Sequence, residues 1–245
     1  TNTSETATGA AITNAFEKLL RAFVERNDGT MPYHIIVYRD GVADNQFENM
    51  LDTEYAAMRE AVDLAGYTED RVKISIIVCQ KRHHTRLAFQ ARNNSDFMNP
   101  CVGLVVDAQG SEFATAAALG NKAKGAGSNM EGVEDPLGCI VGSNLNEFYL
   151  NSHAAVLGTS KPTKYILLHD EIGFKMSELQ LLTFWLTHLY ARCTRAVSIV
   201  APAYYAHWAA KRGRVLLAGG MGRADLKHMS AEWMKDKDTP AMYFI

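Results

Sequence analysis

The sequence predicts an α/β fold in a single domain, and three observations lead to this prediction. Short runs rich in isoleucine and valine alternate with longer stretches whose apolar residues recur at helical spacing. The length of 245 residues suits one large domain, and 47% hydrophobic with 21% charged residues is an ordinary globular composition. No run approaches the roughly 18 apolar residues of a membrane span, so we expect no membrane partner.

The first half of the chain is expected to form a helix, a strand, a second helix and a second strand. The first helix covers 12–26 and is ended by the Asn-Asp-Gly sequence that follows it. A strand at 33–38 is then connected, through a helix at 46–65, to a strand at 73–79. This spacing is typical of a right-handed βαβ unit, so the two strands should be parallel.

Two more strands are expected in the second half, on either side of an unusual segment. The strands are VGLVVD at 102–107 and KYILLHD at 164–170. Between them, residues 108–146 are rich in alanine and glycine and show little periodicity. We interpret this segment as a long surface insertion.

Two helices are expected to complete the domain. Ser177, with Gln180 three residues later, forms a capping box for a helix at 178–192. That helix is apolar nearly all round, which predicts burial. A last helix should cover about 202–217, because proline suits the first turn of a helix.

The cysteines indicate a reducing compartment. They lie far apart and show no metal-ligand spacing: Cys79, Cys101, Cys139 and Cys193. Cys79 ends an apolar strand and Cys193 follows an apolar helix, so both are expected to be reduced core residues. This usage favours the cytoplasm, with the nucleus as the alternative.

Basic residues are concentrated in two segments that contain no acid, although the net charge is −2. The segments 71–95 and 179–224 each hold six lysines or arginines and no aspartate or glutamate. They are expected to form positive surface that attracts phosphate. Chance clustering on solvated faces is the alternative.

HIIVYRDGV, at residues 34–42, ends an apolar strand in an aspartate and a glycine. Asp-Gly is a common turn dipeptide, so Asp40 and Gly41 could form a turn and nothing more. Open α/β sheets also place functional side chains at the carboxyl ends of strands. Asp40 is therefore also a candidate metal-binding carboxylate, although these nine residues alone favour the turn.

Two basic constellations are candidates for nucleic-acid contact. QKRHHTR, at 80–86, would crowd its cations unless phosphates lay between them, although a lone basic run can also be a solvated face. In the last helix, Tyr204, His207 and Lys211 share one face at i, i+3 and i+7. The alternative for His207 is a hydrogen-bonded histidine of the core.

Several stretches, taken in order, resemble the PIWI domain of Argonaute proteins from about residue 12 to Ile245. They are YRDGV with the following QF, QKRHHTR, the Asn-Pro before VVD, SHAAVLGTSKPTKY, and RCTRAVSI with APAYYAH. The resemblance implies an RNase H-like fold, in which a mixed sheet is flanked by helices, and a guide-strand-directed endonuclease. The family's upstream Asp motif is absent, so the first strands are expected to be missing from this piece.

In the family, carboxylates and one His or Asp hold two divalent ions, Mg²⁺ or Mn²⁺. The resemblance matches Asp40 to the acid at the strand end and His207 to the last metal ligand. For the family's catalytic Glu, either Glu5 serves or the acid lies before residue 1, and Glu5 is then a solvated residue of a frayed terminus. His207 would act as a neutral imidazole, so activity should fall in acid.

The resemblance also implies contacts to the guide strand, to which the helix face adds Lys211. Lys161 stands where animal members often have arginine, which would weaken a bidentate contact. Arg212 matches an arginine that helps to hold the 5′ phosphate of the guide. The expected nucleic-acid-binding residues are Lys81, Arg82, Arg86, Lys161, Tyr190, Arg192, Arg195, Ser198, Tyr204, Lys211 and Arg212.

Two functions are compatible with this resemblance. The first is a slicing Argonaute, which binds a small guide RNA and cuts complementary target RNA in gene silencing. The second is a guide-binding Argonaute that silences by recruiting partners, without cleavage. Both imply the remaining Argonaute domains of the parent chain as partners, together with silencing cofactors. The piece alone is expected to bind RNA weakly and to cut nothing.

Overall fold

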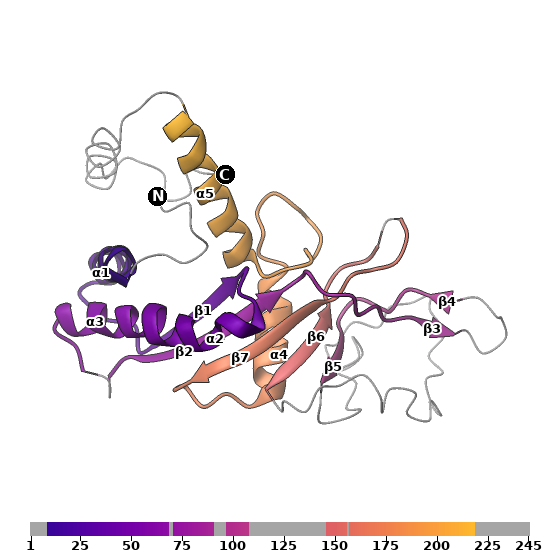
Figure 1. The fold of residues 1–245 in the computed structure, drawn as a ribbon, viewed down its shortest axis with the longest axis horizontal. Coiled ribbons are helices and arrows are strands. Elements are labelled where there is room, and N and C mark those ends of the chain that lie inside the picture. Colours follow the sequence, from indigo (N-terminus) through magenta and orange to yellow (C-terminus); the bar gives the residue numbers. More distant parts are fainter. Residues whose placement is uncertain (1–8, 69–70, 91–96, 108–145, 156, 219–245) are drawn as a thin grey trace.

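A five-stranded mixed sheet forms the centre of the protein (Figure 1). The computed structural model describes residues 9–68, 71–90, 97–107, 146–155 and 157–218. In spatial order the strands are β1 (His34–Asp40), β2 (Lys73–Gln80), β7 (Thr163–Asp170), β6 (Glu147–Asn151) and β5 (Leu104–Asp107). β1 and β2 are parallel, whereas β2–β7, β7–β6 and β6–β5 are antiparallel. A separate two-stranded ribbon consists of β3 (Phe89–Gln90) and β4 (Phe97–Met98).

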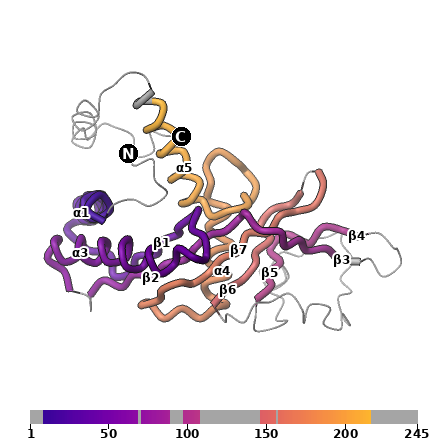
Figure 2. The backbone as a smooth tube through the Cα atoms, in the orientation of Figure 1, coloured from indigo at the N-terminus to yellow at the C-terminus, as the bar shows by residue number. Residues whose placement is uncertain are grey.

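Helices cover both faces of the sheet (Figure 1). One face carries α2 (Phe47–Met50), a π-helical turn (Leu51–Tyr55) and α3 (Ala56–Leu64), which run on without a break, and α1 (Gly9–Arg26) packs on α3. The other face carries α4 (Met176–Leu186). Figure 2 shows α5 (Ala201–Ala218) rising from the edge of the sheet at which β1 ends.

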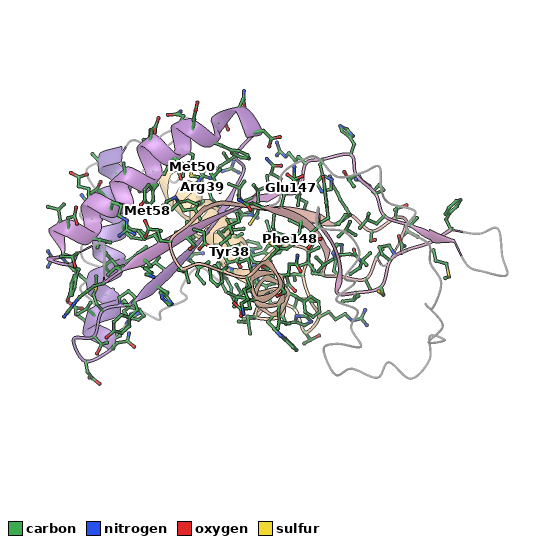
Figure 3. All side chains as sticks on the ribbon, turned by 90° about the horizontal axis from the view of Figure 1, so that it is seen from below. Tyr38, Arg39, Met50, Met58, Glu147 and Phe148 are labelled. Atoms are coloured by element: carbon green, nitrogen blue, oxygen red, sulfur yellow. The ribbon has the colours of Figure 1, made fainter. Side chains whose placement is uncertain are left out.

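β2 is buried on both sides and separates two hydrophobic clusters. Its even-numbered residues Ile74, Ile76 and Val78 pack with α1, α2 and α3 in one cluster. Ile77 and Cys79 pack with α4 and the start of α5 in the other. The alternation follows from the period of two residues in a strand. β1 divides its side chains in the same way, and Figure 3 shows Tyr38 and Arg39 on opposite faces of the sheet.

Most elements expected from the sequence are confirmed. β1 and β2 are parallel, with Ile35 opposite Ile74 and Asp40 opposite Cys79, as the βαβ spacing predicts. The helices at 12–26, 46–65 and 202–217 are present with ends shifted by a few residues. Within the described parts of the chain, no helix is both long and apolar enough to cross a membrane.

The helix expected at 178–192 differs in its ends and its burial. α4 begins after Lys175, so Ser177 lies inside the helix and the predicted capping box is wrong. It ends early because the Thr187 hydroxyl donates to the Phe184 carbonyl oxygen at 2.6 Å. Trp185 is 47% exposed, so one face of α4 meets solvent.

Other differences follow from the path of the chain. Since α4 ends before it, Cys193 lies in a loop and is exposed, which corrects the expectation of a core residue. β6 was not expected, because its five residues begin and end with polar side chains. Glu147 is buried against Lys164, and Asn151 donates to the carbonyl oxygens of Pro100 and Cys101. Glu5, Cys139 and nearly all of the segment 108–146 lie outside the described residues.

Candidate metal and nucleic-acid site

The predicted site residues gather at one edge of the sheet. β1 and β2 are parallel and both end there, which brings Asp40 beside Cys79 and places Lys81 directly after β2. β7 runs the opposite way, so the loop that contains Lys161 precedes it at the same edge. This arrangement joins segments that lie more than a hundred residues apart in the sequence.

Asp40 and His207 are in direct contact. The Nε2 atom of His207 lies 2.8 Å from Oδ2 of Asp40, and α5 packs against β1 to bring them together. The side chain of Asp40 is 25% exposed and that of His207 is 59% exposed, so both are open to a ligand. Gly41 follows with φ of +78°, a left-handed conformation in which glycine has no Cβ to strain.

The backbone of Asp40 is fixed from the opposite face of the sheet. Arg39 makes a bidentate pair with Glu54, with Nε–Oε2 at 2.9 Å and Nη2–Oε1 at 3.0 Å. A third nitrogen of the same guanidinium donates to the carbonyl oxygen of Asp40. The hydrogen bonds that Arg39 donates to Glu54 raise the pKa of Arg39. The strand end that presents the Asp40 carboxylate is therefore held by a charged pair that is itself largely buried.

The groups beside Asp40 are unsuited to nucleophilic catalysis. Burial raises the pKa of the Cys79 thiol, and the charge of Asp40 adds to the effect. Burial also raises the pKa of Tyr38, which forms a 2.9 Å hydrogen bond with Thr183. Since a thiolate is the reactive form of cysteine, Cys79 is expected to be inert. The chemistry of this edge rests on the carboxylate and the imidazole.

Asp40 and His207 fit part of the ligand set of a divalent ion. Ligands at neighbouring positions of an octahedral Mg²⁺ lie about 3 Å apart, since each is about 2.1 Å from the ion, and the two donor atoms here are separated by 2.8 Å. Mg²⁺ is usually held by one or two carboxylates, with waters and substrate phosphate completing the shell. Over the described ranges, no group of three His, Cys, Asp or Glu residues could hold a metal. Further acids would have to come from other parts of the protein.

A cationic cluster adjoins this pair. The Nζ atom of Lys81 donates to the hydroxyl of Ser198, which also bonds the Tyr204 hydroxyl at 3.1 Å. Burial lowers the pKa of Lys81, and the Lys161 ammonium lowers it further, while Asp40 acts in the opposite direction. Two ammonium groups close enough to influence each other, beside one acid, leave net positive charge at the rim of the site.

Three buried polar atoms without hydrogen-bond partners belong to segments that adjoin the cationic cluster. Within the described chain, Nδ1 of His83, Nδ1 of His153 and the hydroxyl of Ser160 are buried and form no hydrogen bond. His83 is near Lys161, and His153 is near Lys81. Such atoms are costly to leave unpaired. Together with the neighbouring ammonium groups, they define a candidate anion cradle.

An aromatic network extends from the cluster along α5. The ring of Tyr204 stacks on that of Tyr190, with centroids 4.9 Å apart. The indole nitrogen of Trp208 donates to the Tyr190 hydroxyl at 2.6 Å. The cations of Arg192 and Lys211 lie over the Trp208 ring, at 4.1 and 4.7 Å from its centroid. Six of the expected RNA-contacting residues thus belong to one connected structure: Lys81, Tyr190, Arg192, Ser198, Tyr204 and Lys211.

The remaining expected contacts are distributed around this structure. Lys161 is partly exposed, and the other four side chains are exposed: Arg82, Arg86, Arg195 and Arg212. Arg86 donates to the carbonyl oxygens of His83 and Thr85, which orders the basic run. Ser198 is buried and its hydroxyl is occupied within the protein, so a direct contact of Ser198 with RNA stays a prediction.

Sequence reasoning missed two residues of the site. His153 lies in a stretch that supports the family resemblance, but nothing in its spacing links it to Lys81. Trp208 lies three residues before Lys211 in the last helix, and this i, i+3 spacing is a signal that could have found it. Its contact with Arg192, from another segment, has no local signal.

The sequence matches a known family model and curated relatives. The family model of the Piwi domain matches residues 1–117 and 138–218. Argonaute 14 of Oryza sativa subsp. japonica is 39% identical over 203 residues, which are 81% of this chain and 16% of that protein. Argonaute 5 of Arabidopsis thaliana is 39% identical over 201 residues, covering 80% of this chain and 17% of that protein. The chain thus spans about a sixth of the length of these relatives.

Solved structures share the fold. The C-terminal lobe of a budding yeast Argonaute superposes with a TM-score of 0.60 at 22% identity, over 87% of this chain and 41% of that one. Kluyveromyces polysporus Argonaute, solved with a guide RNA, also gives 0.60 at 22% identity, over 86% of this chain and 23% of that one. The mixed sheet flanked by helices is therefore the RNase H-like fold that the sequence predicts, and the chain belongs to the Piwi domain family of Argonaute proteins.

Proposed function

We propose that this domain binds the guide strand of a small RNA and contributes to metal-dependent cleavage of a complementary RNA. One observation carries the proposal: the contact of Asp40 with His207 lies beside a cationic cluster with unpaired buried polar atoms. A metal-donor pair and an anion cradle at one sheet edge suit a phosphodiester substrate. The relatives and the superposed structures, all Argonautes, support the same reading.

RNA binding rests on the chemistry of the cationic cluster. Lys81 and Lys161 provide ammonium groups for backbone phosphates, and exposed Arg82 and Arg86 can each bind a phosphate through two nitrogens. These groups contact phosphate rather than base edges, so they position a strand without reading its sequence. Base pairing between guide and target would supply the specificity.

For cleavage, the residues of this chain have defined roles. Bound Mg²⁺, or Mn²⁺, would supply activation of a water and neutralisation of charge on the scissile phosphate. Asp40 and His207 would hold the metal, with the imidazole carrying its proton on Nδ1. Lys81, fixed by Ser198, would balance the charge of the neighbouring phosphate. Additional acids would come from residues outside the described ranges.

Guide binding without cleavage is the second candidate function. It is favoured by one observation, that the described residues provide two metal donors and no group of three. In that case Asp40 and His207 would act as a hydrogen-bonded pair that ties α5 to β1. Guide binding is common to both candidates, so a cleavage assay separates them.

The test is metal removal from the complete protein loaded with a guide RNA. We expect a labelled complementary RNA to be cut at one position in Mg²⁺ or Mn²⁺, and cutting to stop when EDTA is added. Binding of the target should survive EDTA at matched ionic strength, because the lysine and arginine contacts need no metal. Tight binding with no cut product in either metal would contradict cleavage and leave the second candidate.

RNA affinity is also expected to rise in mild acid. Burial lowers the pKa of His83 and of His153 in the free protein, and nearby cations lower both further. A bound phosphate would raise these pKa values, so the complex takes up protons. Affinity should therefore increase as the pH falls below the pKa that these imidazoles have in the complex, by at most about tenfold per pH unit for each proton taken up.

This is measured as the dissociation constant between about pH 8 and pH 5.5, where imidazoles titrate. The RNA should carry a 5′ hydroxyl, because a terminal phosphate titrates in the same range. His153→Gln should flatten the profile, whereas His84→Gln, an exposed position in the same basic run, should not. An unchanged profile in His83→Gln and His153→Gln alike would contradict the assignment.

A further inference from the structure

Trp208 contacts two cations that come from different segments of the chain. The guanidinium carbon of Arg192, in the loop after α4, lies 4.1 Å from the centroid of its ring. The ammonium of Lys211, one turn later on α5, lies 4.7 Å from the same centroid. A ring attracts a cation through its negative face, and tryptophan does so best among the aromatic side chains. Cations from two separate segments thus both lie within 4.7 Å of the centre of one ring.

The indole itself is held in place. Its nitrogen donates to the hydroxyl of Tyr190, and the ring of Tyr190 stacks on that of Tyr204. The hydroxyl of Tyr204 bonds Ser198, which accepts from Lys81. Tyr190 is buried, whereas Arg192 and Lys211 are exposed. A fixed ring thus carries two cations that face solvent.

Among the described residues, the two cations lack the acids that usually accompany such groups. Across the described residues, neither Arg192 nor Lys211 forms an ion pair with an aspartate or glutamate. The whole segment 179–224 contains no acid at all. Two cations on one ring repel each other, and an anion bound to both would offset that repulsion. Arginine can offer two nitrogens to a phosphate and lysine a compact charge.

We propose that Trp208 is a positioning residue, which aligns Arg192 and Lys211 as a two-cation clamp for a phosphodiester of bound RNA. The inference rests on the proposed RNA-binding function and names a residue on which part of that binding depends. Trp208 itself need not touch the RNA. Its contribution is to hold the two cations close together before RNA arrives, so that less of their conformational freedom is lost on binding.

The experiment is a double-mutant cycle in the complete protein, with an unstructured RNA as the probe. Lys211→Gln and Arg192→Gln should each weaken binding about three- to tenfold and reduce the salt slope of log K by about 0.7. Trp208→Leu removes no charge, yet should weaken binding about fivefold. In the Trp208→Leu background, Lys211→Gln should cost less than about twofold, because the clamp is already lost. Trp208→Phe should retain most of the affinity, since it keeps an aromatic face.

Trp185→Leu is the matched control, because Trp185 is a half-exposed tryptophan on α4 that contacts neither cation. The RNA affinity of the Trp185→Leu variant should not change. Additive losses for Trp208→Leu and Lys211→Gln would overturn the inference and leave RNA binding intact. Absence of RNA binding by the unsubstituted protein would instead overturn the proposed function.

If Trp208→Leu does not fold, the cycle is run with Trp208→Phe, Lys211→Gln and Arg192→Gln. Effects of Arg192→Gln and Lys211→Gln that simply add in both backgrounds would then overturn the inference.

Discussion

Replacing Asp40 with alanine is expected to abolish cleavage of complementary RNA while guide binding changes by less than about twofold. The carboxylate is one of the two proposed metal donors, and its Oδ2 contacts His207 at 2.8 Å. Loss of a metal ligand at the reacting phosphate should raise the barrier by about 4 kcal/mol, or about a thousandfold in rate. The guide should remain bound, because the cations that would hold it are unchanged.

The measurement is single-turnover cleavage of a labelled target, beside a filter-binding assay for the guide. Asp40→Asn tests charge at constant shape and should be almost as inactive as the alanine variant. Asp44→Ala is the matched control, since Asp44 lies four residues away and bonds Gln80 rather than His207. Cleavage by Asp40→Ala at the rate of the unsubstituted protein would refute the assignment of Asp40 as a ligand.

Glu54→Ala should lower the free energy of unfolding by about 3–5 kcal/mol, the cost of breaking a buried ion pair from one side. The Glu54 side chain is 7% exposed and that of Arg39 is 29% exposed, so the guanidinium would lose its partner in a largely dry position. The same arginine holds the carbonyl oxygen of Asp40. Protein that still folds should therefore also cut RNA more slowly.

Chemical denaturation measures the stability, and Glu48→Ala, an exposed acid on α2, is the control that should change little. A double variant separates the two effects. Arg39→Met with Glu54→Leu replaces the pair by apolar groups and should recover most of the stability. It should not recover cleavage, because the Asp40 carbonyl oxygen then lacks the guanidinium that holds it. Full activity in that double variant would show that the pair serves stability alone.

Local patterns predicted much of the fold. The β-branched runs that form β1 and β2 are continuous and apolar, and the helix between them has a clear helical period. The parallel pairing of β1 and β2 therefore followed from the strand–helix–strand spacing. The end of α4 did not follow, because it depends on Thr187. The Thr187 hydroxyl bonds Phe184, and the Thr187 carbonyl accepts from the distant Val197. A contact between such distant residues produces no periodic pattern in the sequence.

The candidate site was likewise predictable only in part from the sequence. Asp40 and His207 were placed together by family resemblance, and the structure brings their side chains into contact, although their role with a metal stays a prediction. The partnership of Arg192 with Trp208 joins a loop to a helix, and the approach of His153 to Lys81 joins two loops. Such pairs are set by the three-dimensional path of the chain rather than by neighbouring residues.

The π-helical turn at Leu51–Tyr55 determines which side chains of the covering helix face β1 and β2. Two turns of regular α-helix take about 7.2 residues, and the wider turn adds about one more. Met50 and Met58, eight positions apart, thereby fall on one line, and both are buried. Glu54 falls midway on that line and so reaches Arg39. The orientation of the Asp40 carboxylate thus depends on the number of residues in this π-helical turn. Deleting one residue of the turn would rotate Glu54 away from Arg39 without altering any side chain of the site.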